Sequence, residues 1–215
     1  MLSSSEIKNQ AIASLDGKWG ASAILVLIYS LISYAFAGGL PNLIVPYEPV
    51  SGATMSFVGN TGLSALIAIL FLPMSWGMLV TFLEVARGTQ SINYGNLTKG
   101  YHDFTRICLT MLLTNVYTIL WSLLLIIPGI VKSYSYSMTS FILADRPDLA
   151  YNEAIEESMR MMDGHKMRLF ILDLTFLGWA LLCLLTLGIG FLFLEPYIYT
   201  SHAKFYEDLL AAEND

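Results

Sequence analysis

The sequence predicts an all-α membrane protein, a polytopic transmembrane bundle of six helices arranged as three hairpins, with short amphipathic helices on the cytoplasmic side. The first observation behind this prediction is the composition: 55% of the 215 residues are hydrophobic and 13% are charged, whereas roughly 25% are charged in soluble domains. The second is the mean hydropathy of +0.61, which arises from long apolar runs. The third is the position of the basic residues between alternate runs. Together they exclude an ordinary water-soluble fold.

Four apolar runs are long enough to cross a hydrocarbon core about 30 Å thick as helices. They cover residues 21–37, 63–86, 107–127 and 169–187. Two further stretches, 130–144 and 189–203, are less apolar because they contain Lys132 and Glu195 among other polar residues. We expect all six to be helices that cross the membrane.

The basic residues favour six spans over four. If all six stretches cross, the inside segments hold ten of the eleven Lys and Arg residues, and the long outside loop at 40–62 holds none. The inside segments are residues 1–20, 87–106, 145–168 and 204–215. This asymmetry follows the positive-inside rule and predicts that both termini are cytoplasmic. The net charge of −6 argues against nucleic acid as a partner.

The chain also shows internal similarity, which predicts three repeat units within a single membrane domain of residues 1–215. The units are residues 1–87, 88–145 and 146–210. In the first and third, a short amphipathic stretch ends at a glycine and a basic residue, at 11–18 and 154–166, before an apolar run begins. Ser3 and Glu6 predict a capping box for the first of these short helices. Any membrane protein in which apolar spans alternate with polar segments shows some similarity of this kind by chance. True repetition and chance similarity therefore both stay open.

The residues of these units resemble a known family. The resemblance rests on Ala13, Gly17, Lys18, Trp19, Pro128, Gly129, Ile130, Tyr134 to Met138, Ile142 to Asp148, Ala154, Ile155, Ser158, Met162 to Gly164, Arg168 to Phe170, Leu172 to Leu174, Gly178, Trp179, Leu187 to Gly190, Pro196, Tyr197, Phe205 and Tyr206. This pattern resembles the bacterial integral-membrane family called domain of unknown function 975. It is more distantly similar to the membrane domain attached to some glycerophosphodiester phosphodiesterases.

The resemblance implies a multi-pass protein of a bacterial inner membrane, and it implies no catalytic residue and no cofactor. The phosphodiesterase chemistry is not carried over, because the sequence shows no soluble phosphodiesterase part. Cys108 and Cys183 stand alone in apolar runs, so we expect neither a disulfide nor a metal site. No nucleotide-binding or zinc-protease motif is present, and we expect no enzyme.

Polar residues inside the predicted spans form the candidate site, because ionisable groups in a bilayer are costly and are often functional. The site comprises Lys132, Glu195, Tyr136, Tyr199, His202 and Asn115. Lys132 and Glu195 lie three and five residues beyond the glycines of two tight turns, which places each about 5 to 8 Å below its turn. We expect them to form an ion pair that joins the second and third hairpins.

The polar faces of the third, fourth and sixth spans allow two interpretations. They could line a water-filled path in which Glu195 and His202 titrate, or they could make hydrogen bonds between packed helices. Asp173 and Glu84 lie near the inner boundary, where a salt bridge or helix anchor would explain them.

We therefore expect a non-enzymatic role, in which the protein binds or organises a protein or lipid component of the cell envelope. The alternative is a small-solute or ion transporter or channel that uses the polar faces. The expected partners are the lipid bilayer and either a membrane protein or a second copy of the chain. Small residues at 35, 38 and 39, or at Gly77 and Thr81, would provide the contact surface.

Overall fold

The computed structural model of the chain describes residues 1–34 and 53–213, and for residues 53–65 it describes the backbone only. Every regular element in this part of the chain is a helix, which confirms the predicted all-α class. The helices are α1 (Ser4–Leu15), α2 (Trp19–Tyr34), α4 (Ala53–Ala86), α5 (Asn96–Lys99), α6 (Phe104–Leu124), α7 (Ile126–Tyr136), α8 (Thr139–Asp145), α9 (Asn152–Met161), α10 (Lys166–Leu185) and α11 (Phe191–Glu213).

Three of these helices are long and apolar enough to cross a membrane, namely Leu66–Ala86 of α4, the whole of α6 and the whole of α10. A fourth candidate arises if α1 and α2, which bend by 92° where they meet, count as one span. The structure therefore supports membrane character with three or four candidate spans rather than six. Two predicted spans are missing because 130–144 divides between α7 and α8 and 189–203 lies mostly in the more polar α11. The stretch at 21–37 forms α2, whose 16 residues qualify as a candidate span only together with α1.

Helix α4 begins ten residues earlier than expected, at Ala53 instead of residue 63. The prediction of an outside loop at 40–62 is therefore wrong for residues 53–62, which are helical. Residues 40–52 lie outside the described part of the chain. The physical reason is that no proline occurs between Pro49 and Pro73, so nothing removes a backbone donor over the first turns of α4. Pro73 lies within the helix and does not end it.

The two short amphipathic helices predicted on the inside face are present as α1 and α9. Ser3 and Glu6 form the predicted capping box, in which the Ser3 amide donates to the Glu6 carboxylate at 2.7 Å. Gly17 after α1 has a φ of +70° and Gly164 after α9 a φ of +76°, so each helix is followed by a left-handed glycine before the next one begins. The two corners are alike, whereas the division of the chain into three units stays a prediction.

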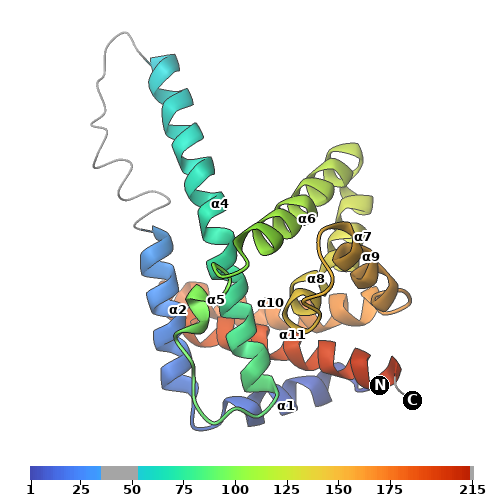
Figure 1. Cartoon of the computed structure of the whole chain (residues 1–215). Helices are drawn as coiled ribbons and strands as arrows, with labels where there is room; N and C mark the ends of the chain where they lie inside the picture. Colours follow the sequence, from blue (N-terminus) through green and yellow to red (C-terminus); the bar gives the residue numbers. More distant parts are fainter. Residues whose placement is uncertain (35–52, 214–215) are drawn as a thin grey trace.

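Helix α11 lies at the centre of the fold and packs against α1, α2, α4 and α10. In Figure 1 the α10–α11 hairpin and α1 run across α2 and α4 instead of alongside them, so the helices do not form a parallel bundle. The α11 side chains Phe205, Tyr206 and Leu209 are buried in the larger core cluster, where Tyr206 stacks on Phe141 of α8 with 5.1 Å between ring centroids. A second cluster joins α2 to α4 through residues such as Leu25 and Met78.

The surface expected around Gly77 and Thr81 is not free for a partner. A Cβ on Gly77 would lie 2.1 Å from the carbonyl oxygen of Asn96, because α5 and its flanking turns pack directly on α4 at this point. Thr81 is buried, and its hydroxyl donates to the Gly77 carbonyl oxygen at 3.0 Å. These small residues therefore serve packing within the chain, and the residues expected beside them at 35–39 lie outside the described part.

We predict that Gly77→Ala destabilises the protein, because the added methyl meets backbone atoms that cannot rotate away. Overpacking of this kind costs about 1 to 3 kcal/mol. Gly178→Ala in α10 is the matched control, since nothing lies within 4 Å of its Cβ position, and alanine stabilises an exposed helix by roughly 0.5 to 1 kcal/mol over glycine. Thermal unfolding in detergent should show a lower midpoint for the first variant only, and equal midpoints would contradict the close packing of α5 on α4.

Candidate functional site

Lys132 of α7 is held by aromatic rings and not by Glu195. Its Nζ lies 5.2 Å from the ring centroid of Trp121 and 5.9 Å from that of Tyr136, within the range of cation–π attraction. The same nitrogen lies 3.7 Å from the Met159 sulfur of α9. The expected ion pair is therefore wrong, because α7 packs between α6 and α9 whereas the first turns of α11 face α2.

Beside Lys132 lies a small polar groove of about 160 Å³ between α6, α7 and α9. It is lined by Tyr117, Tyr136, Asn152, Ile155, Glu156 and Met159. The Tyr117 hydroxyl donates to the Asn152 side-chain oxygen at 3.0 Å and so ties α6 to the start of α9. Of the predicted site residues, the structure brings Lys132 and Tyr136 to this groove.

Glu195 and Tyr199 lie together on another part of the molecule, one turn apart on α11. Tyr199 stacks on Phe82 of α4 with 5.5 Å between ring centroids, so its ring belongs to the packing between these helices. Glu195 is partly buried near Tyr29 of α2, and within the described part of the chain no hydrogen bond or ion pair joins its carboxylate to another side chain.

His202, the fifth predicted residue, is bound to Asp173 of α10. The His202 Nε2 lies 2.5 Å from one carboxylate oxygen of Asp173, and the Tyr134 hydroxyl donates to the other oxygen at 3.0 Å. The Asp173 carboxylate on α10 thus connects this helix to both α7 and α11. The sequence predicts an anchoring role for Asp173 but not these partners, because residue spacing within one helix does not indicate which side chains of other helices that residue meets.

Asn115, the last predicted residue, bonds within its own helix, where its side-chain nitrogen donates to the Met111 carbonyl at 2.9 Å. Hydroxyl groups along the same polar faces do likewise. On α6 these are Thr110, Thr114, Thr118 and Ser122, on α7 they are Ser133 and Ser135, and Ser137 follows directly after α7. Each donates to a carbonyl three or four residues earlier. These Asn, Thr and Ser side chains are thus satisfied locally, which is how membrane helices commonly accommodate Ser and Thr. The buried Thr139 hydroxyl, at the start of α8, has no hydrogen-bond partner in the described part of the chain.

The break between α7 and α8 is closed by Ser158 of α9. Its hydroxyl donates to the Ser135 carbonyl at 2.9 Å and accepts the Met138 amide at 3.1 Å, both in the buried interior. A single side chain therefore bonds one backbone carbonyl near the end of α7 and one backbone amide before α8. Nothing in the local sequence indicates this role.

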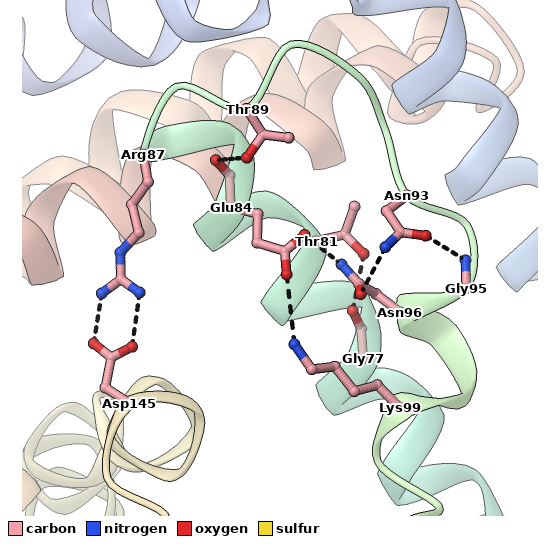
Figure 2. A network of polar contacts seen from close by, with 10 residues as sticks. All are labelled: Gly77, Thr81, Glu84, Arg87, Thr89, Asn93, Gly95, Asn96, Lys99 and Asp145. Carbon is pink, nitrogen blue, oxygen red and sulfur yellow. Dashed lines mark hydrogen bonds and ion pairs between the residues drawn. The ribbon is translucent and has the colours of Figure 1, made fainter.

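The carboxyl ends of α4, α8 and α11 meet at Arg87, as Figure 2 shows in part. The guanidinium binds Asp145 through two hydrogen bonds of 2.7 and 2.5 Å, and its Nε donates to Glu207 at 2.8 Å. Asp145 raises the pKa of Arg87, chiefly through these hydrogen bonds. The distribution of basic residues predicts that these three helix ends lie on one face of the membrane, but it does not indicate that they touch.

Glu84, one turn earlier on α4, fulfils its predicted role as an anchor (Figure 2). Its carboxylate accepts a 2.7 Å hydrogen bond from the side-chain nitrogen Nδ2 of Asn96 and lies 3.5 Å from the side-chain nitrogen Nζ of Lys99. Arg168 and Asp208 make a comparable contact of 2.6 Å between α10 and α11, and Asp208 also accepts a hydrogen bond from the Leu2 backbone amide at 2.9 Å. Within the described residues no group of three His, Cys, Asp or Glu side chains could hold a metal ion.

We predict that Arg87→Ala lowers the thermal midpoint more than Arg160→Ala does. Arg87 joins three helices, whereas Arg160 bonds Glu157 within its own helix and Glu213 near the end of α11. Both arginines are more than one third exposed, so solvent screening limits the losses to about 1 to 2 kcal/mol for Arg87 and less than 1 kcal/mol for Arg160. The measurement is thermal unfolding at low and high salt, and a larger effect of Arg160→Ala would contradict the central role of Arg87.

Comparison with known proteins identifies a family but no activity. The family model described as protein of unknown function (DUF975) matches residues 1–132 and 122–213. No curated protein and no solved structure matches the chain. The more distant similarity to the membrane domain of glycerophosphodiester phosphodiesterases is not shown by these comparisons. The matched residues cover nearly the whole sequence, and the chain therefore belongs to the DUF975 family.

Proposed function

We propose that the protein is a non-enzymatic component of a bacterial inner membrane that binds or organises another protein or a lipid of the cell envelope, with both termini in the cytoplasm. The observation that carries this proposal is the local hydrogen bonding of the Thr, Ser and Asn side chains on α6 and α7. These side chains donate to carbonyls of their own helices, and the Lys132 ammonium lies over aromatic rings. Groups satisfied in this way do not need water.

The surface available to a partner is the apolar outer face of α6 and α10. Both helices bury few of their residues within the chain, and their outward side chains include Ile119 and Leu120 on α6 and Leu177 and Leu181 on α10, each 55 to 59% exposed. Exposed apolar area of this extent requires lipid or a membrane-embedded partner to cover it. A second copy of the chain would serve the same purpose.

Transport of an ion or small solute is the second candidate. It is favoured by the chain of titratable groups from Tyr134 through Asp173 to His202, which connects three helices. Such chains carry protons in some membrane transporters. The two candidates differ in whether water reaches these residues.

Thiol labelling distinguishes the two functions. Single cysteines at Lys132, Asn115 and His202, in a background without Cys108 and Cys183, should resist a membrane-impermeant maleimide from either side and react after denaturation. Asp163→Cys, in the exposed turn before α10, should react from one side and serves as the control. Continuous labelling from Lys132 or Asn115 to His202 would replace the organising role with transport.

Photo-crosslinking in cells tests the partner surface. A photoreactive phenylalanine at Ile119, Leu120, Leu177 or Leu181 should give a discrete adduct with a protein or lipid, because these side chains point outward from the two apolar helices. The matched control is Tyr94, which is 42% exposed in the segment before α6. Identical adducts at the control and at all four probes would contradict a specific surface on α6 and α10.

A further inference from the structure

We propose that the turn between α10 and α11, residues 186–190, stays in the hydrocarbon of the bilayer and does not emerge into water on the far side. The partner of this surface is the acyl chains of the lipids. The inference depends on the membrane insertion proposed above and is independent of any protein partner.

The first support is the exposed surface of the turn. Leu185, Leu187 and Ile189 are 80%, 94% and 63% exposed, so the tip of the hairpin presents large apolar side chains outward. From Asp173 to Glu195 the sequence contains no other charged residue. A turn that emerges at a membrane surface usually carries polar residues or interfacial aromatic side chains, and this one carries a single threonine.

The second support is the hydrogen bonding of the backbone. All nine consecutive N–H groups from Thr186 to Leu194 find an acceptor within the hairpin, at 3.0 to 3.2 Å. Eight of them bond to backbone carbonyls, and the amide of Gly190 bonds to the Thr186 hydroxyl. A turn in water does not need such complete internal bonding, because water can accept these hydrogen bonds. In hydrocarbon each unsatisfied N–H costs several kcal/mol.

The third support is the reach of the hairpin. Asp173 and Arg168 bind polar partners at the start of α10. At 1.5 Å per residue the turn lies about 20 Å beyond Asp173 and about 27 Å beyond Arg168, so even an α10 aligned with the membrane normal would only just bring the turn to the far boundary of a roughly 30 Å hydrocarbon core. Figure 1 shows the hairpin running across α4, the most apolar candidate span, which shortens its reach across the membrane further.

An apolar groove of about 400 Å³ adjoins the tip and continues this lipid-compatible surface. It lies where the hairpin meets the corner of α1 and α2, and its lining includes Trp19, Trp179, Cys183, Phe193 and Tyr197. The lining is almost wholly apolar, so an acyl chain fits it better than water does.

The direct test is labelling of Leu187→Cys in the background without Cys108 and Cys183. Despite its exposure, this cysteine should resist an impermeant maleimide both in intact cells and in inverted vesicles, and it should react after solubilisation in detergent. Asp163→Cys should react in inverted vesicles, and Ser51→Cys, in the predicted outside loop, in intact cells. Labelling of Leu187→Cys in intact cells as fast as Ser51→Cys would overturn the proposal.

A second variant tests the hydrogen bonding. Thr186→Val removes the acceptor of the Gly190 amide at nearly constant volume, whereas Thr175→Val removes a hydroxyl that only donates, to the Leu172 carbonyl at 2.7 Å. In lipid nanodiscs the first variant should lower the thermal midpoint by several degrees more than the second, because no water replaces the lost acceptor. Equal midpoints would indicate a hydrated turn and overturn the proposal. Neither result depends on whether the outer face of α6 and α10 binds a partner.

Discussion

The enclosure of α11 is the constraint on which the rest of the structure depends. This helix packs against four others and carries charged or polar residues at intervals along its whole length, and burial favours partners for these groups on the neighbouring helices. His202 meets Asp173, Glu207 meets Arg87 and Asp208 meets Arg168. These three contacts fix the positions of α4 and α10 relative to α11, and the apolar side chains between them fill the core.

The remaining polar residues divide into two groups by what they bond to. The Thr, Ser and Asn side chains of α6 and α7 bond to carbonyls of their own helix. Those at helix ends and breaks bond to other helices, as Arg87 and Ser158 do. The first group adapts single helices to lipid and the second group assembles the helices. This division explains why residues that look alike in the sequence have different surroundings in the structure.

Local features of the fold could be predicted from the sequence because they depend on neighbouring residues. The all-α class, the capping box at Ser3 and the glycine corners at Gly17 and Gly164 follow from composition and short spacings. The site could be predicted only in part. Spacing placed Lys132 beside Tyr136 but gave it the wrong partner, since the register between hairpins depends on how α11 packs against α2. The same limit applies to Arg87, whose three-helix contact has no local signature.

The basic residues alone do not distinguish six membrane spans from three or four. The positive-inside rule compares charge on the two sides of a membrane. The tight turns after α6 and α10 carry no charged residue, so they add no charge to the outer side of the membrane whether or not they reach it. A hairpin that crosses twice and one that enters and returns within the hydrocarbon leave the same basic residues inside. The asymmetry of Lys and Arg therefore determines where the hairpin ends lie, whereas the depth of each turn depends on its own hydrogen bonds and side chains.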